Sequence, residues 1–131
     1  MRLLLDTHLA LWLAIEEGQL SQGELAVLAA ADSYPLFSAV SIWELRLKWT
    51  SLHPSGQRKG LASPEAVLQI LRNSGFEELP LTSDDAATEL EMPLTHKDPF
   101  DELLMAQAQA HRLRLLTRDA LLSRHPLAIS A

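Results

Sequence analysis

Four short segments of the chain each place a carboxylate beside a run of apolar residues. They are Leu3-Leu4-Leu5-Asp6-Thr7, Ser41-Ile42-Trp43-Glu44, Asp98-Pro99-Phe100-Asp101 and Leu115-Leu116-Thr117-Arg118-Asp119. Two of these acids directly follow predicted buried strands, and ligands bind at the carboxyl ends of the strands in an open α/β sheet. Acids gathered there would repel one another unless a hard cation neutralised them, and oxygen ligands suit Mg²⁺ or Mn²⁺. The pattern therefore favours a metal-dependent enzyme that cleaves phosphodiesters.

Each acid also has a purely structural explanation. Asp6 and Asp119 stand where a helix N-cap is expected. Glu44 precedes Lys48 by four residues, the spacing of a surface ion pair on a helix. Acids in the first turn of a helix, as in the third segment, are favoured by the helix dipole. These explanations account for each acid singly but poorly for four segments that offer an acid at equivalent places.

The third segment leaves its acidic ligand open. Asp98 and Asp101 are three residues apart at the start of a predicted helix, a spacing that puts both on one face. Two like charges side by side are costly without a cation, so we expect at least one of them to be a ligand. Both remain candidates.

Composition limits the function classes. The chain has 131 residues, which we expect to form one domain, 1–131, with a real hydrophobic core. It has no cysteine, which excludes disulfides and zinc–thiolate sites and fits the cytoplasm. An acid follows the N-terminus too early for a signal peptide, and no apolar run could span a membrane. The net charge of −6 argues against simple electrostatic binding of nucleic acid, although the five acids account for most of the excess.

Periodicity predicts alternating strands and helices. Capping signals mark helix starts at Ser21 with Glu24, a capping-box pattern, at Ser63 with Pro64, and at Asp98. We expect strands over 2–5, 36–38, 76–79, 113–117 and 126–130, and helices over 7–15, 24–31, 40–49, 64–73, 82–90, 99–111 and 119–124. Such alternation is typical of βαβ units, so the fold class is α/β, a short parallel sheet of four to five strands flanked by helices in three layers. The segment 50–63 is expected to be a loop, with Arg58 and Lys59 exposed.

Other chemistry-bearing residues give weaker signals. The five histidines lack the HxxxH or HxH spacing of a zinc site, although His8 and His96 lie close to candidate acids. The scattered glycines form no phosphate-binding loop. We expect Trp12, Trp43 and Trp49 to be core residues rather than a base-stacking platform, and Leu47 to be buried with Trp43.

The ordered set of segments resembles the four motifs of PIN-domain ribonucleases, particularly the VapC toxins of type II toxin–antitoxin modules. In that resemblance the first acid falls on Asp6, the second on Glu44 and the fourth on Asp119. The third falls on Asp98 or Asp101, with Asp101 slightly favoured. The small polar residues beside the first and second acids fall on Thr7 and Ser41.

The resemblance implies a three-layer PIN fold, a homodimer, an RNA substrate and a VapB-like antitoxin that wraps the toxin. We therefore expect a Mg²⁺- or Mn²⁺-dependent ribonuclease in which water attacks the phosphodiester. The expected ligands are Asp6, one or both of Asp98 and Asp101, and Asp119, with Glu44 completing the site. The residues expected to orient groups or hold phosphates are Thr7, Ser41, Lys48, Arg118, Arg58 and Lys59. The alternative is a catalytically inactive PIN-like module that only binds a partner. An aspartyl phosphatase is disfavoured, because no second Asp lies two residues after Asp6.

Overall fold

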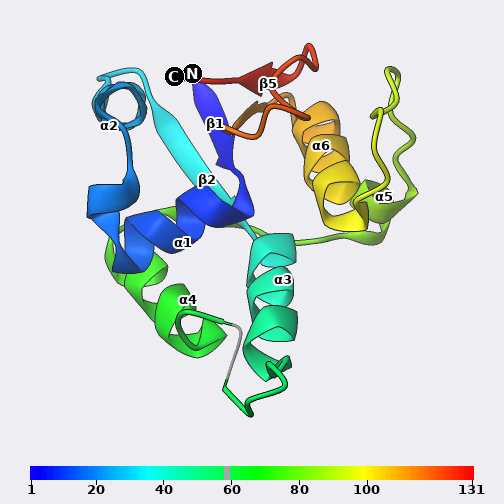
Figure 1. Ribbon diagram of the computed structural model, residues 1–131. Coiled ribbons are helices and arrows are strands. Elements are labelled where there is room, and N and C mark those ends of the chain that lie inside the picture. Colours follow the sequence, from blue (N-terminus) through cyan, green and yellow to red (C-terminus); the bar gives the residue numbers. More distant parts are fainter. Residues whose placement is uncertain (58–59) are drawn as a thin grey trace.

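Five parallel strands form the centre of the computed structural model, which describes residues 1–57 and 60–131 (Figure 1). The strands are β1 (Arg2–Leu5), β2 (Tyr34–Ser38), β3 (Glu77–Leu79), β4 (Arg114–Leu116) and β5 (Ala128–Ile129), in the order β3-β2-β1-β4-β5. β1 lies at the centre of the sheet. Its three leucines are completely buried, which shows that both faces of the strand are covered. The α/β class and the parallel sheet predicted from the sequence are confirmed.

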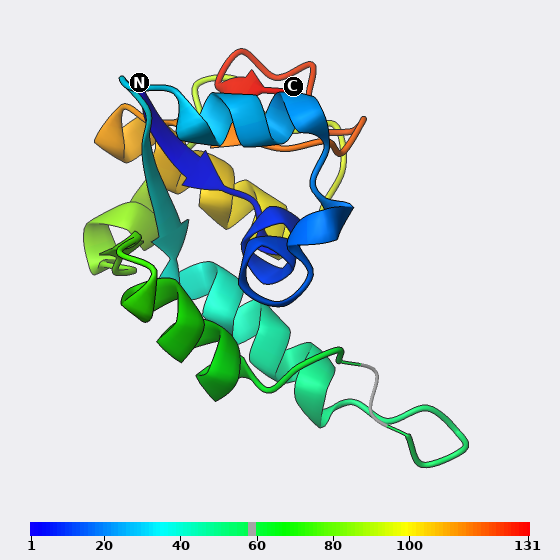
Figure 2. The same cartoon turned by 90° about the vertical axis from the view of Figure 1, so that its left-hand side faces the viewer.

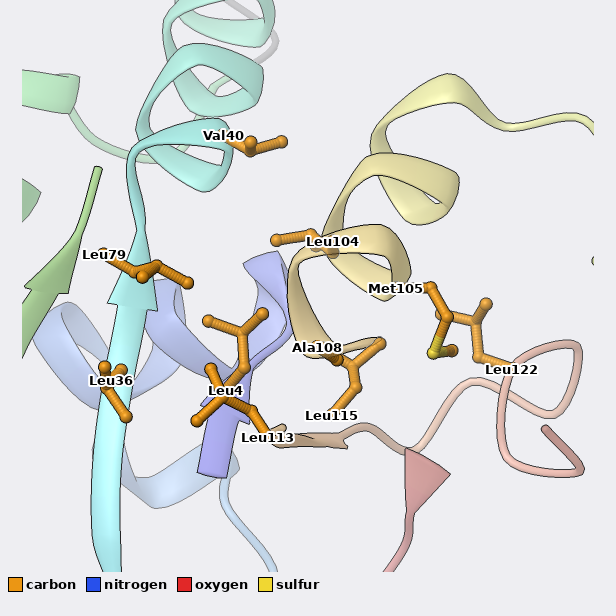
Figure 3. Packing of buried hydrophobic residues seen from close by; sticks show 10 residues of the cluster. All are labelled: Leu4, Leu36, Val40, Leu79, Leu104, Met105, Ala108, Leu113, Leu115 and Leu122. Carbon is orange, nitrogen blue, oxygen red and sulfur yellow. The ribbon is translucent and has the colours of Figure 1, made fainter. Parts of the chain in front are cut away.

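Alternate residues of the strands pack into two separate hydrophobic cores, one on each face of the sheet. Leu4, Leu36 and Leu115 pack with the buried face of α6 (Pro99–His111), as Figure 3 shows. Their neighbours Leu5, Phe37 and Leu116 pack on the other side, with α1 (Thr7–Ile15) and α4 (Pro64–Asn73). The two-residue period of a strand thus explains why near-continuous apolar runs produce helices on both faces of the sheet.

The helices begin at the expected capping residues. Asp98 caps α6, Ser63 with Pro64 begins α4, and a capping box formed by Ser21 and Glu24 begins α2 (Gln22–Ala29). The remaining helices are α3 (Ala39–Thr50), α5 (Ser83–Ala87) and the short 3₁₀ helix η1 (Glu17–Gln19). Within the described ranges, no helix is both long and apolar enough to cross a bilayer.

Two predicted helices are wrong in extent or type. The segment 119–124 forms turns rather than a helix, because the short connection ends at Pro126 and must return the chain to β5. The helix predicted over 82–90 stops at Ala87. Beyond it, the side chain of Gln109 binds the carbonyl of Glu89 at 3.0 Å and the N–H of Glu91 at 2.9 Å, which holds that backbone in a non-helical path.

The expected burial of two side chains on α3 is also wrong. Trp43 is 49% exposed and Leu47 is 36% exposed. The cause is the position of α3, which continues past the carboxyl end of β2 and away from the sheet (Figure 2). Only part of its surface is covered there, by α1, α4 and α6.

The carboxyl ends of β1 and β4 lie side by side. Leu5 pairs with Leu116 in the parallel register, and the N–H of Asp6 extends the ladder by donating to the carbonyl of Leu116 at 3.1 Å. The residues after these strands, Asp6 and Thr117, are therefore neighbours although 111 positions separate them. This edge carries the candidate site.

Candidate active site

Asp6 is a buried carboxylate with two protein donors. One oxygen accepts the backbone N–H of Leu9 at 2.9 Å, which caps α1, and the other accepts the hydroxyl of Thr117 at 2.6 Å. Burial nevertheless raises the pKa of Asp6, and the negative charge of Asp119 raises it further. Asp6 is thus both a helix cap and an incompletely neutralised acid, so the structural and functional explanations apply together.

Asp119 connects the acids of two other segments. Its charge raises the pKa of both Asp6 and Asp101, which places it within electrostatic reach of each. The hydroxyl of Thr117 fixes this arrangement, because it donates to Asp6 and accepts the N–H of Asp119 at 3.1 Å. One Asp119 oxygen accepts the N–H of Leu121 at 2.8 Å, while the residue as a whole is exposed.

Asp98 and Asp101 occupy different environments. A single oxygen of Asp98 accepts the N–H groups of Phe100 at 2.9 Å and Asp101 at 3.2 Å, so Asp98 caps α6. Asp101 is half-buried, and burial together with the charges of Asp98 and Asp119 raises its pKa, although the hydrogen bond from His96 lowers it. Asp101 therefore interacts with the other acids of the site, whereas Asp98 has a sufficient structural role.

His96 holds Asp101 in place. Its Nε2 lies 2.9 Å from Asp101 Oδ2, and within the described ranges its buried Nδ1 has no partner. The proton must lie on Nε2, since two facing lone pairs would repel and a buried Nδ1–H would go unsatisfied. His96 therefore donates to Asp101, fixing its side chain and leaving its Oδ1 for another group.

Glu44 joins the site through Thr7. The hydroxyl of Thr7 lies 2.7 Å from Glu44 Oε1 and 3.0 Å from the hydroxyl of the buried Ser41. Thr7 has one proton to donate, and the carboxylate is the stronger acceptor, so Ser41 donates in turn to Thr7. Glu44 Oε2 pairs with the ammonium of Lys48 at 3.2 Å, the ion pair expected from the spacing.

Arg118 has a structural setting that the sequence did not indicate. Its guanidinium binds both carboxylate oxygens of the buried Glu24 and the carbonyl of Gln19, and it stacks 4.5 Å above the ring of Trp12. The hydrogen bond from Arg118 lowers the pKa of Glu24 despite its burial. A role for Arg118 in holding phosphate stays a prediction, because this network already engages its charge.

Residues 3–126 match the family model described as PIN domain. The chain belongs to the PIN domain family. It is also 33% identical over 132 residues to Ribonuclease VapC22 of Mycobacterium tuberculosis, a match that covers 97% of this chain and 95% of that protein. The family suggested by the four acidic segments is thereby confirmed.

Solved structures show the same PIN fold. One is VapBC2 from Rickettsia felis bound to a DNA fragment from its promoter, with a TM-score of 0.65 and 18% identity, covering 100% of this chain and 98% of that one. Another is a toxin–antitoxin complex from Klebsiella pneumoniae, with a TM-score of 0.60 and 21% identity, covering 96% and 94% of the two chains. At these identities the likeness confirms the three-layer architecture.

The candidate ligands of this PIN chain are of the type that binds hard divalent cations. The candidate ligands Asp6, Asp101 and Asp119 offer only carboxylate oxygens, and burial together with neighbouring acids raises the pKa values of Asp6 and Asp101. Within the described ranges, no three acidic or histidine side chains already form a cage around one point. Mg²⁺ does not require one, because it commonly binds one or two carboxylates and completes its shell with water and phosphate oxygens.

Sequence reasoning about the PIN site missed a role for Thr117, the last residue of the strand predicted over 113–117. The available signal was a hydroxyl directly after the apolar pair Leu115-Leu116, at the carboxyl end of the predicted strand. It also missed Glu24, whose capping box supplied a complete explanation by itself. Arg58 and Lys59, expected to hold phosphates, lie outside the described residues.

Proposed function

We propose that this chain is a Mg²⁺- or Mn²⁺-dependent endoribonuclease and the toxin component of a VapC-like type II toxin–antitoxin module. The observation that carries the proposal is the electrostatic interaction among Asp6, Asp101 and Asp119 at one edge of the sheet, where two of the three pKa values are raised. Stability alone gives no reason to hold acids in this state. The relationship to a protein named Ribonuclease VapC22 supports RNA as the substrate.

Asp6, Asp101 and Asp119 would hold the cation, with Asp98 as the remaining candidate in the third segment. A bound divalent ion would supply electrostatic stabilisation of the phosphate and a lowered pKa for the attacking water. The chain's own residues prepare the site. Thr117 orients Asp6 and the backbone of Asp119, and His96 orients Asp101.

Glu44 and its partners form the second part of the proposed mechanism. Thr7 and Ser41 fix one carboxylate oxygen, and Lys48 neutralises the other. Glu44 so placed can accept a proton or position water beside Thr7. Because the ammonium of Lys48 is half-exposed, it can also approach a flanking phosphate.

We propose a VapB-like antitoxin and a second copy of the chain as protein partners, acting in the cytoplasm. The apolar surface of α3 supports this. Two hollows of about 570 and 400 Å³ meet at Ala39 and the exposed Trp43. Exposed apolar surface of this kind marks protein-binding sites. The Rickettsia felis and Klebsiella pneumoniae structures are themselves complexes with antitoxins.

The test is cleavage of single-stranded RNA by the purified chain with EDTA, Mg²⁺ or Mn²⁺. We expect cleavage only with the metals, and loss of about two orders of magnitude or more in Asp6→Asn and Asp101→Asn, since metal coordination contributes several kcal/mol. Asp84→Asn is the matched control, because Asp84 is an exposed acid on α5. If both site variants cleave RNA as well as the parent, the mechanism is wrong.

Metal titration by calorimetry separates the enzyme from an inactive binding module. An enzyme should bind Mn²⁺ with an affinity that is lower in Asp6→Asn and unchanged in Asp84→Asn. A module that only docks a partner should show no uptake that depends on these acids.

A further inference from the structure

A further hollow, distinct from the two on the apolar surface of α3, lies between α1, α3 and the α3–α4 connection. It has a volume of about 310 Å³, and its lining includes Thr7, His8, Trp12, Lys48 and Leu61. This is the lower end of the size range of small-molecule sites, which are mostly apolar with a few placed polar groups. None of the five acids lines it, so it is distinct from the proposed metal site.

The hollow has an aromatic wall formed by His8 and Trp12, of which the Trp12 ring is packed against an anchored side chain. The rings of His8 and Trp12 lie 5.5 Å apart with an interplanar angle of 38°. The Trp12 ring also contacts the guanidinium of Arg118, which is anchored to the buried Glu24. A fixed ring loses little freedom when a ligand stacks on it, so this wall favours a flat, π-bearing ligand.

Two residues that line the hollow, Thr7 and Lys48, contact the acid Glu44. Thr7 lines the hollow, follows Asp6 in the chain and binds Glu44 at 2.7 Å. Lys48 also lines the hollow and neutralises Glu44 at 3.2 Å. A ligand in the hollow therefore meets a cation and a hydroxyl where it approaches the acids. That order, from a flat apolar end to a phosphate-binding end, matches a nucleotide.

The remaining wall is formed by Gly60, Leu61 and Ala62, in the connection between α3 and α4. A Cβ at Gly60 would stand 2.8 Å from the Cα of Trp49, so only glycine lets the chain pass so close to α3. The next residue, Leu61, is 64% exposed and lines the hollow with an apolar side chain. The close approach at Gly60 thus places Leu61 opposite the wall made by α1.

We propose that this hollow, lined by Thr7, His8, Trp12, Lys48 and Leu61, binds one base of single-stranded RNA next to the phosphate that is cleaved. The inference rests on the proposed function and names the part of the substrate that the same site recognises. A base must leave its helical stack to enter, so the subsite selects single strands and unpaired loops. Stacking accepts any base, and preference arises from the few polar groups at the rim.

Binding without cleavage tests the subsite directly. The probes are fluorescent hexaribonucleotides and an abasic ribose-phosphate hexamer, measured with the whole chain in Ca²⁺, a hard oxygen-seeking cation. We expect the parent to bind base-bearing probes more tightly than the abasic probe. His8→Ala and Leu61→Ala should weaken the base-bearing probes on the order of ten-fold and leave the abasic probe unchanged. Tyr34→Ala is the control, an exposed aromatic at the amino end of β2.

Cleavage of a randomised RNA pool in Mg²⁺ completes the test. The parent should show a base preference at one position beside the cut, which His8→Ala and Leu61→Ala flatten. Two results would refute the subsite and leave the proposed function intact. In the first, the parent cleaves RNA but the variants keep its base preference and its affinities. In the second, the parent cleaves RNA but binds abasic and base-bearing probes equally. If the parent binds bases as expected but cleaves nothing, the subsite stands and the proposed function is wrong.

Discussion

Asp6 and Asp85 are two buried aspartates with opposite electrostatic outcomes. Asp6 is 7% exposed and Asp85 is 2% exposed, so burial penalises the charge of both. The pKa of Asp6 is raised by that burial. Burial acts on Asp85 in the same direction, but hydrogen bonds from Gln107, His111 and the backbone of Thr82 outweigh it, and the pKa of Asp85 is lowered.

The difference lies in the neighbours of the two carboxylates. Asp85 accepts Gln107 Nε2 at 2.9 Å and His111 Nε2 at 2.7 Å, and it closes the capping box of α5. Asp6 has a hydroxyl and one N–H as donors, with the acid Asp119 nearby. At Asp85, hydrogen-bond donors outweigh the cost of burying the negative charge. At Asp6 they do not, so the negative charge is available to a bound cation.

Substitution of Asp6 should give the largest effect and should act on function alone. We expect Asp6→Asn to lose about two orders of magnitude or more in RNA cleavage, because a charged oxygen ligand is removed. Its free energy of unfolding in EDTA should be equal to or above that of the parent, since Asn also caps helices and the buried charge is gone. Urea unfolding measures the stability; a clear loss of stability would show that Asp6 belongs to the same class as Asp85.

His96 should behave as a positioning residue for Asp101. We expect His96→Ala to weaken Mn²⁺ binding and RNA cleavage by about 10–100-fold, the usual effect of removing a residue that orients a metal ligand. Calorimetry measures the affinity separately from activity. His96→Gln should recover part of it, because an amide N–H can replace Nε2–H.

Asp98→Asn tests the other candidate ligand of the third segment. Asn caps a helix about as well as Asp, so stability should hold. A larger loss of metal affinity in Asp98→Asn than in Asp101→Asn would assign the third ligand to Asp98 instead.

Substitution of Asp85 should act on the fold alone. Asp85→Ala leaves Gln107 Nε2 without this buried acceptor and His111 Nε2 without its partner, and we expect it to lower the free energy of unfolding by about 1–3 kcal/mol. Metal affinity should not change. A loss of Mn²⁺ binding in a folded Asp85→Ala protein would contradict the separation between the two aspartates.

The pH dependence of stability should be opposite for the two residues. The folded pKa of Asp85 lies below its ordinary value of 3.8, so its stabilisation is complete above 3.8 and disappears as the pH falls through the folded pKa. The folded pKa of Asp6 lies above 3.8, so Asp6 destabilises the protein increasingly as the pH rises from 3.8 through the folded pKa. In EDTA, Asp85→Asn should therefore be less stable than the parent at about pH 7, with the gap closing below 3.8, while any gain in Asp6→Asn should be confined to higher pH. Urea midpoints across this range measure both; parallel profiles would contradict the comparison.

Much of the fold was predictable because it depends on local patterns. The leucine runs of β1 and β4 predict buried parallel strands, and the signals at Ser21, Ser63 and Asp98 predict helix starts that the structure confirms. The failures occur where a distant group decides. Gln109 ends α5 early, and the projection of α3 beyond the sheet leaves Trp43 exposed.

The four acidic segments, their order and the strands that two of them follow could be read from residue type and period, because these are local properties. The hydrogen bonds and charges around each acid depend instead on how the chain folds. The tertiary structure placed Thr117 between Asp6 and Asp119, set His96 against Asp101, and engaged Arg118 with Glu24. The physical reason is that a carboxylate's pKa and orientation depend on donors and charges within a few ångströms, and here those partners come from distant parts of the chain.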